Sequence, residues 1–437
     1  MGTPSPESVS TKLQRIARLA KEDPERALNN LHHYIDIDFL REAYRRTRKD
    51  GAVGVDGQTA DQYAANLEEN LRGLLDRFKS KTYYAPPVKR VQIPKADGKQ
   101  RPLGIPTFED KVLQRAVTMV VSEIWETNFV PTSHAFRPDK SAKEALHALR
   151  EKLFEFKGGW VLDVDVAAYF DNIVHSALRE ILRQRVRDGL ICRTIDCWLN
   201  AGVLEQGQLV RPGKGTPQGG VISPLLANIY LHEVLDRWFV EAVQPRMRGK
   251  SYHLRFADDF ILLFEHEEDA RRVLEVLPKR FGKYGLTIHP EKTKLVRFNR
   301  PLLNSSGKGH DSEGKPPGSF DFLGFKHFWG RTRRNTWAVK QETAKKRFQR
   351  SLTAITAWCR KHRHWPLPDQ HGKLSQKLRG YYNYFAQAGN MRAVWAYYDQ
   401  VKKIWRKWLN RRSQRGKHTW VRYVAYLERN PLPAPNS

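Results

Sequence analysis

Two adjacent aspartates between apolar runs constrain this chain more than any other feature. Asp258 and Asp259 stand in the segment RFADDFILLF, which ends in the continuous apolar run of residues 260–264. The pattern predicts a strand, a tight turn and a second strand. Neighbouring like charges at the end of apolar strands are costly unless a positive group lies beside them. A divalent cation held by carboxylate oxygens would supply that charge, and a solvated hairpin turn is the alternative.

A second acidic segment lies about a hundred residues upstream. Residues 160–173 read WVLDVDVAAYFDNI, so Asp163 and Asp165 alternate with strand-forming apolar residues. Residues two apart on a strand share a face, and both side chains therefore point the same way. An amphipathic strand with one side in water explains this pattern. If the strand lies beside the hairpin, however, it can bring a third carboxylate to Asp258 and Asp259. Three carboxylates around two divalent ions suit in-line nucleotidyl transfer.

Eight sequence blocks in a fixed order give further evidence about the class of protein. They are GVDG (54–57), YYAPPVKRVQIPKADGKQRPLGIP (83–106), SHAFRP (133–138), DVAAYFDNI (165–173), GTPQGGVISPLLANIYL (215–231), RFADDF (255–260), GLTIHPEKT (285–293) and FLGF (322–325). Their order resembles that of reverse transcriptases, most closely the maturases encoded by bacterial mobile group II introns. The resemblance implies an α+β right-hand polymerase, with fingers and palm of antiparallel sheet plus helices and a three-helix α thumb.

The resemblance also assigns roles to residues of the acidic motifs. Asp165, Asp258 and Asp259 match the catalytic aspartates, and with Val166 they would bind two Mg²⁺ ions, for which Mn²⁺ can substitute. Phe170, five positions after Asp165, matches the ring that lies against the 2′ position of the sugar. Such a ring would exclude ribonucleotides by steric clash. Without the motif, ordinary core packing explains Phe170.

Basic and polar residues are expected to bind the incoming nucleotide. Lys95 and Arg101 flank a predicted hairpin turn at residues 96–98, where Asp-Gly is a strong hairpin signal. They match residues that hold phosphates in the family, and a basic hairpin touching the nucleic acid backbone is the alternative. Gln218 would contact the nucleotide. A separate block, Leu323 and Gly324, matches the primer grip.

The C-terminal part is helical in pattern and very basic. Three amphipathic segments run from Lys345 to Arg415, as a thumb domain requires. Arg379, Tyr381 and Tyr382 lie close together on the middle segment. They are either an RNA-binding group or core aromatics with a solvated arginine.

The predicted domains follow from these assignments. We expect an N-terminal extension at residues 1–60, reverse transcriptase fingers and palm at 61–330, a thumb or maturase (X) domain at 331–415 and a short tail at 416–437. A loop rich in Gly, Ser and Pro is expected at 299–319. No endonuclease with cysteine pairs is expected.

Charge and cysteine content limit the class of protein. Lys and Arg number 76 against 47 Asp and Glu, a formal charge of +29, which predicts salt-dependent binding of nucleic acid. Ribosomal and DNA-packing proteins share this charge but rarely carry three ordered acidic motifs on apolar strands. Three scattered cysteines suit a reducing compartment. Without an apolar run of membrane-spanning length, we expect a bacterial cytoplasmic protein that binds no membrane.

The acidic motifs and the resemblance together predict an RNA-directed DNA polymerase. The resemblance alone implies that it belongs to a group II intron, copies intron RNA into cDNA during retrotransposition and assists RNA splicing as a maturase. The expected partners are the intron RNA template, a DNA primer or target and dNTPs, with no obligate protein partner. A non-catalytic RNA-binding splicing factor is one alternative, although the chain retains all three carboxylates. A related reverse transcriptase recruited for host defence or repair is another.

Overall fold

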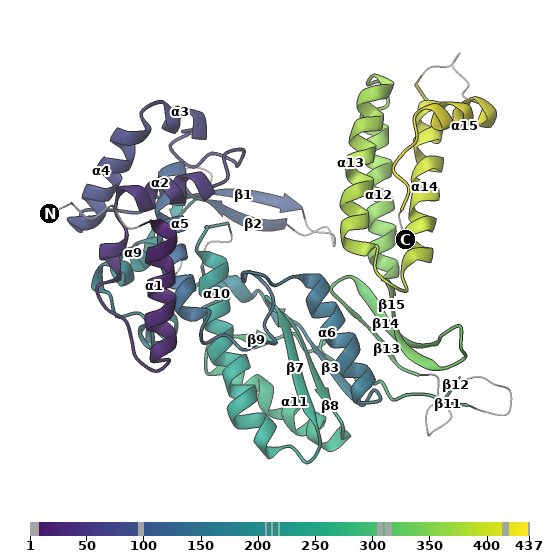
Figure 1. Ribbon diagram of the computed structural model, residues 1–437, viewed down its shortest axis with the longest axis horizontal. Coiled ribbons are helices and arrows are strands. Elements are labelled where there is room, and N and C mark those ends of the chain that lie inside the picture. The colour runs from purple at the N-terminus through teal and green to yellow at the C-terminus, as the bar shows by residue number, and fades with distance from the viewer. Residues whose placement is uncertain are drawn as a thin grey trace. The chain divides into compact units, whose positions relative to one another are not determined.

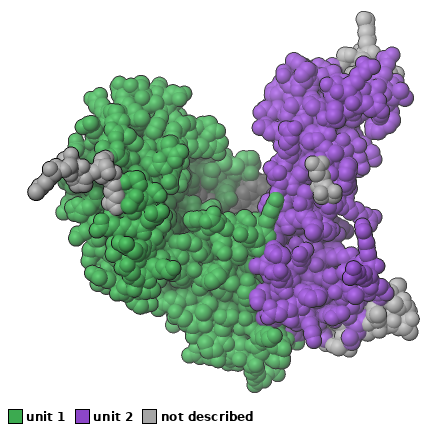
Figure 2. All heavy atoms as spheres, viewed as in Figure 1, with its two compact units in different colours: residues 1–145, 161–295 green, residues 146–160, 296–437 purple. Residues whose placement is uncertain are grey.

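The chain divides into two compact units. The structure is a computed structural model, and it describes residues 8–94, 100–205, 208–210, 213–216, 219–303, 309–310, 317–412 and 419–435. Unit 1 comprises residues 1–145 and 161–295, and unit 2 comprises residues 146–160 and 296–437 (Figure 2). Helix α6 (Ala142–Glu155) contributes residues to both units.

Unit 1 begins with helices. They are α1 (Val9–Glu22), the 3₁₀ turn η1 (Leu31–Tyr34), α2 (Ile37–Arg46), α3 (Ala60–Ala65), α4 (Leu67–Lys79) and α5 (Phe108–Trp125). The apolar residues of this first segment predict one buried helix face made of Leu13, Ile16, Ala17, Leu19 and Ala20. In α1, Leu13, Ile16 and Ala20 are buried and Ala17 is half-buried, whereas Leu19 is exposed. The prediction for Leu19 was wrong, because one residue is a 100° step around a helix and takes it off a narrow stripe.

The first sheet of unit 1 contains the basic hairpin predicted from the sequence. Strands β1 (Val88–Pro94) and β2 (Gln100–Ile105) pair antiparallel, which confirms the hairpin, and the turn between them lies outside the described residues. The sheet order is β2-β1-β5-β6, with β5 (Val203–Glu205) parallel to β1 and β6 (Gln208–Val210) antiparallel to β5.

The second sheet carries the acidic motifs. Its order is β10-β3-β8-β7, built from β3 (Trp160–Val164), β7 (Ser251–Phe256), β8 (Asp259–Phe264) and β10 (Lys294–Arg297). Strands β7 and β8 form the predicted hairpin, and α11 (Glu267–Gly282) packs against β8 (Figure 1). A short pair, β4 (Val166–Ala167) and β9 (Thr287–Ile288), lies beyond β3 in the chain.

Further helices complete unit 1. They are α7 (Tyr169–Asn172), α8 (His175–Arg183), α9 (Gly189–Asn200), α10 (Ser223–Leu231), the π-helical η2 (His232–Arg237) and η3 (Phe239–Val243), and the 3₁₀ turn η4 (Gln244–Arg246). The apolar spacing after Gly219 and Gly220 predicts a helix with Leu225, Ile229, Val234 and Leu235 on its inner side. All four side chains are buried.

Unit 2 combines a small sheet with helices. Strands β13 (Ser319–Phe322), β14 (Phe325–Arg331) and β15 (Trp337–Thr343) form an antiparallel sheet, and β11 (Leu302–Leu303) pairs with β12 (Gly309–His310). Much of the predicted 299–319 loop lies outside the described residues. Helices α12 (Lys345–Lys361), α13 (Leu367–Phe385) and α14 (Met391–Leu409) confirm the predicted helical segments (Figure 1). Helix α15 (Trp420–Arg429) falls where the sequence predicted only a tail.

Across the described part of the chain, no helix combines the length and the apolar character that a membrane crossing needs.

Candidate functional site

The two adjacent aspartates lie at a sharply turned end of the β7–β8 hairpin. Phe256 pairs with Asp259 at the last step of the register. Between them Ala257 adopts a left-handed backbone conformation, with φ of +59°. Such a conformation is unusual for a residue with a side chain, and it persists only where neighbouring groups enforce it.

A buried arginine, Arg255, holds this turn through hydrogen bonds. The fully buried guanidinium of Arg255 donates two hydrogen bonds to Asp236, at 2.8 and 2.6 Å. It also donates to Asn228 Oδ1 at 2.9 Å and to Ser133 Oγ at 2.8 Å. A further bond of 3.1 Å runs from Arg255 Nη1 to the carbonyl oxygen of Ala257. The guanidinium therefore connects the core of unit 1 to the left-handed residue that precedes Asp258.

The third carboxylate comes from the neighbouring strand. Strand β3 lies beside β8 in the sheet, and Asp165 stands directly after β3 and before β4. The negative charge of Asp165 contributes to raising the pKa values of both Asp258 and Asp259. The structure thus brings together the three carboxylates that the sequence singled out.

The three charges are only partly compensated. Burial, followed by repulsion from Asp258 and Asp165, raises the pKa of Asp259 to about 6. Solvent still reaches the Asp259 side chain, so neighbouring protein atoms remove only part of its hydration. Burial also raises the pKa of Asp258, although the positive charge of Arg101 opposes the shift. Arg101 therefore lies close enough to the carboxylates to act on them electrostatically.

Lys292 is a residue of this site that sequence reasoning missed. Its Nζ donates to Asp165 Oδ2 at 2.8 Å. The backbone supports this arrangement, because His289 N donates to the carbonyl oxygen of Asp165 at 2.8 Å. Lys292 belongs to the block GLTIHPEKT, which marked the segment but gave no reason to choose this lysine.

The donor atoms of the site fit a divalent cation. Carboxylate oxygens are the hard ligands that such ions prefer, and a cation would relieve the repulsion among the three aspartates. Within the described ranges, no three His, Cys, Asp or Glu side chains are arranged closely enough to hold an ion as they stand. Asp165 Oδ2 is paired with Lys292, so an ion at this carboxylate would compete with the lysine for its charge.

The segment after Asp165 packs on the glycine-rich loop. Thr216 N donates to the carbonyl oxygen of Phe170 at 2.9 Å, and Gly215 N donates to that of Ile173 at 2.8 Å. Gly219 has φ of +123°, and a Cβ there would lie 2.7 Å from Gly104 O. The close approach of the two backbones at this position therefore needs glycine. Phe170 is half-buried. The predicted nucleotide ligands Lys95 and Gln218 lie outside the described residues.

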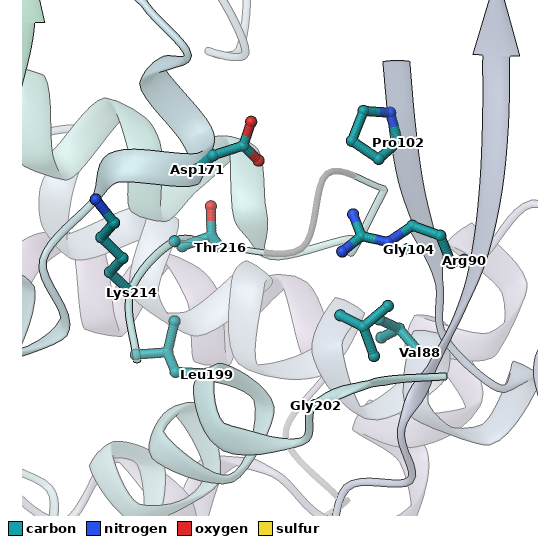
Figure 3. A pocket seen from close by; sticks show the side chains of 11 residues that line it. Val88, Arg90, Pro102, Gly104, Asp171, Leu199, Gly202, Lys214 and Thr216 are labelled. Carbon is teal, nitrogen blue, oxygen red and sulfur yellow. The ribbon is translucent and has the colours of Figure 1, made fainter. Parts of the chain in front are cut away.

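A cavity of about 260 Å³ lies behind the basic hairpin. Figure 3 shows Arg90 and Pro102 on one side of it, with Asp171 and Lys214 on the other. Arg90 pairs with Gly104 across the strands, and Ile93 pairs with Arg101. Because side chains alternate along a strand, Arg101 and the cavity lie on opposite faces of the hairpin. The cavity is therefore separate from the hairpin face that presents Arg101.

In unit 2, the predicted primer-grip residues form a strained turn between β13 and β14. Leu323 and Gly324 both have positive φ, +48° and +79°. The hydroxyl of Tyr384 donates to the carbonyl oxygen of Leu323 at 2.8 Å, which holds the turn against α13. A left-handed leucine is uncommon and is typical of functional turns.

The predicted RNA-binding group on α13 divides between surface and core. Arg379 is exposed, whereas the ring of Tyr381 is buried and stacks on Tyr397 at a centroid distance of 3.7 Å. Tyr382 is half-buried, and its hydroxyl donates to Pro433 O at 3.0 Å. For Tyr381 the structure favours core packing over RNA contact, because its ring face is already covered.

Comparison with known proteins decides the family. The family described as reverse transcriptase (RNA-dependent DNA polymerase) matches residues 93–327, more than half of the chain. The chain belongs to the reverse transcriptase family. Protein YkfC of Escherichia coli is 33% identical over 331 residues, which cover 67% of this chain and 85% of that protein. The group II intron-encoded protein LtrA of Lactococcus lactis is 33% identical over 303 residues, 66% of this chain and 50% of LtrA.

These relatives confirm the resemblance to group II intron reverse transcriptases, although the chain spans only half the length of LtrA. Among solved structures, a chain of the telomerase of Candida albicans matches with a TM-score of 0.42 and 12% identity, over 85% of this chain and 65% of that chain. Family membership confirms the α+β right-hand polymerase fold and RNA-directed DNA polymerase activity. Reverse transcriptases use divalent metal ions, which accords with the carboxylate cluster.

Proposed function

We propose that this chain copies group II intron RNA into DNA and assists the splicing of that RNA as a maturase. The resemblance to LtrA supports the intron as its template. One observation carries the catalytic part of the proposal: Asp165, Asp258 and Asp259 come from neighbouring strands and interact electrostatically. A splicing factor without polymerase activity has no need for such a costly cluster.

In the proposed reaction, the 3′-hydroxyl of a primer attacks the α-phosphate of a dNTP and pyrophosphate leaves. The three aspartates, with the backbone of Val166, would hold two Mg²⁺ ions, and Mn²⁺ can substitute. When bound, the ions would activate the hydroxyl and neutralise the leaving oxygen. Arg101, near the carboxylates, would hold the triphosphate. We assign the same task to Lys95 and Gln218, and we assign exclusion of the ribose 2′-hydroxyl to Phe170.

The proposed partners follow from this reaction. They are the intron RNA template, a DNA primer or target and dNTPs, without an obligate protein partner. The Leu323–Gly324 turn would position the primer, and exposed Arg379 would contact RNA. We assign residues 61–330 to fingers and palm and residues 331–415 to the thumb. A bacterial cytoplasmic location accords with the free thiols of Cys192, Cys197 and Cys359.

A primer-extension assay tests the proposal. The purified chain is expected to extend a DNA primer on an RNA template when Mg²⁺ or Mn²⁺ is present. Asp165→Asn should abolish extension, whereas Asp163→Asn, a matched loss of charge two residues away, should retain it. Failure of the wild-type chain to extend any primer with either ion would refute the polymerase. Equal loss in the two variants would refute the special role of Asp165.

A further inference from the structure

The glycine-rich loop before α10 is held at both ends by buried side chains. At its start, His175 Nε2 donates to the carbonyl oxygen of Gly215 at 2.6 Å. At its end, Gln114 Oε1 accepts hydrogen bonds from Val221 N at 2.7 Å and from Ile222 N at 3.4 Å. Both side chains are almost fully buried, His175 in the first turn of α8 and Gln114 within α5. Two helices of unit 1 therefore fix the ends of this loop.

Gln114 provides an acceptor that the start of α10 lacks. Ile222 stands at the N-cap of this helix, where amide groups have no partner within the helix, and its apolar side chain cannot accept a hydrogen bond. Ile222 is only 2% exposed, so water is a poor substitute for the glutamine oxygen. A buried amide without an acceptor is costly. Loss of the Gln114 oxygen should therefore loosen this end of the loop.

Helix α5 is also joined closely to the hairpin that carries Arg101. A two-residue link connects β2 to α5, and it is tightly packed, because a Cβ at Gly54 would lie 2.6 Å from Thr107 Cα. The backbone of Gly219 lies directly against β2, since a Cβ there would lie 2.7 Å from Gly104 O. Strand β2 and α5 thus form one continuous support, which the glycine-rich loop contacts at two points.

In the sequence, Gln218 stands between the two attachment points of the loop. We propose that Gln114 is a positioning residue for nucleotide binding: it fixes the glycine-rich loop, and with it the position from which Gln218 contacts the incoming dNTP. This role rests on the proposed contact between Gln218 and the nucleotide. A looser loop would have to be ordered each time a nucleotide binds, which weakens binding. Loss of the Gln114 oxygen should therefore raise the KM for dNTP more than it lowers kcat.

Steady-state primer extension with variants of the full chain tests this role. Gln114→Met keeps the length of the side chain and removes the acceptor, and it should raise the KM for dNTP about tenfold with little change in kcat. Gln114→Glu retains an acceptor oxygen in either protonation state and should restore most of the nucleotide affinity. Gln114→Asn, whose shorter side chain withdraws the oxygen from the loop, should resemble Gln114→Met and replaces it if the methionine impairs folding.

A matched control comes from another glutamine of unit 1. Gln244 Nε2 donates to the carbonyl oxygen of Ser251 at 2.9 Å, at the end of β7 away from the aspartates. Gln244→Met removes this bond and should leave the KM for dNTP unchanged. Hydrogen exchange followed by mass spectrometry gives an independent readout. The peptide with Val221 and Ile222 should exchange faster in Gln114→Met than in the wild type, but not in Gln244→Met.

A variant of Gln218 separates the positioning role from the nucleotide contact itself. Gln218→Met should raise the KM for dNTP, and adding Gln114→Met to it should raise the KM little further, because the two residues act in one chain of contacts. A wild-type KM in Gln114→Met, an equal rise in Gln244→Met or fully additive effects in the double variant would overturn the positioning role alone. A wild-type KM in Gln218→Met would instead refute the proposed nucleotide contact, and the positioning role with it.

Discussion

Two groups of charge near the β7–β8 turn contrast with each other: the fully buried pair of Arg255 and Asp236, and the more accessible Asp258 and Asp259. Arg255 and Asp236 form a closed pair, in which the guanidinium makes two short bonds to the carboxylate and three more to neighbouring oxygens. Although burial opposes ionisation, the charge of Arg255 holds the pKa of Asp236 well below its usual range. At Asp258 and Asp259 the pKa values are raised instead. The Arg255–Asp236 ion pair thus stabilises the fold, whereas the repulsion between Asp258 and Asp259 is only partly compensated within the protein and favours cation binding.

The largest effect is expected where the charge is uncompensated. Asp258→Asn should lower the rate of primer extension by about 10³-fold or more, because metal-assisted stabilisation of the transition state is worth several kcal/mol. Its thermal stability should stay unchanged or rise, since a half-buried charge that neighbouring carboxylates repel has been removed. Single-turnover extension and thermal unfolding of the same preparation measure both. A strong loss of stability would show that Asp258 stabilises the fold, as Asp236 does, and would contradict the difference drawn between the two groups of charge.

The opposite pattern is expected at the closed pair. Arg255→Met should destabilise the protein by about 3–5 kcal/mol, because Asp236 is left as a buried charge without its partner. Denaturant unfolding measures this change. The double variant Arg255→Met with Asp236→Leu should recover most of the stability, as apolar replacements of buried pairs do. A double variant as unstable as the single one would contradict the view that charge compensation is the main role of this pair.

A pH dependence of stability is expected from Asp259. Its pKa is raised to about 6 in the folded chain and lies near 3.9 in an unfolded chain. The folded state therefore binds the extra proton between these values, and stability falls as pH rises through this window. Because solvent reaches Asp259, we expect only about 1 kcal/mol. Chemical unfolding without metal measures this change. As pH rises from about 4 to about 6.5, Asp259→Asn should lose less stability than the wild type. Parallel curves of unfolding free energy against pH for the two proteins would contradict this expectation.

The smallest effect is expected at Lys292, whose ammonium group forms an ion pair with Asp165. Lys292→Met should tighten Mn²⁺ binding to the nucleic acid-free protein by up to about fivefold, since a solvent-exposed ion pair contributes at most about 1 kcal/mol. Electron paramagnetic resonance of free Mn²⁺ measures the affinity. Lys294→Met, a nearby exposed lysine, serves as the control. Equal affinities in wild type and Lys292→Met would show that the pair does not compete with the ion.

The sequence predicted those parts of the site whose signals are local. Strand alternation and the Asp-Asp turn located the hairpin. The period of the upstream strand indicated both Asp163 and Asp165, and only the family resemblance selected Asp165. Lys292 could not be found this way, because its contact with Asp165 spans 127 positions of the chain. Arg255 lay inside the quoted motif, yet its burial depends on Asp236 and Asn228 from the preceding helical segment.

In the helical segments too, local sequence signals could not predict contacts between distant residues. Periodicity located α12, α13 and α14, but it could not say which aromatic residues face the partner helix. Tyr381 therefore looked available for RNA, although Tyr397 of α14 covers its ring. Composition alone gave no sign that residues after 416 form α15.

Locating a bound ion tests the central claim most directly. Anomalous diffraction from crystals grown with Mn²⁺ is expected to show density coordinated by Asp165 together with Asp258 or Asp259, and Lys292 should have moved off Asp165. Density only at other sites, with the Lys292–Asp165 pair intact at saturating Mn²⁺, would contradict the claim that these three carboxylates form one cation-binding catalytic centre.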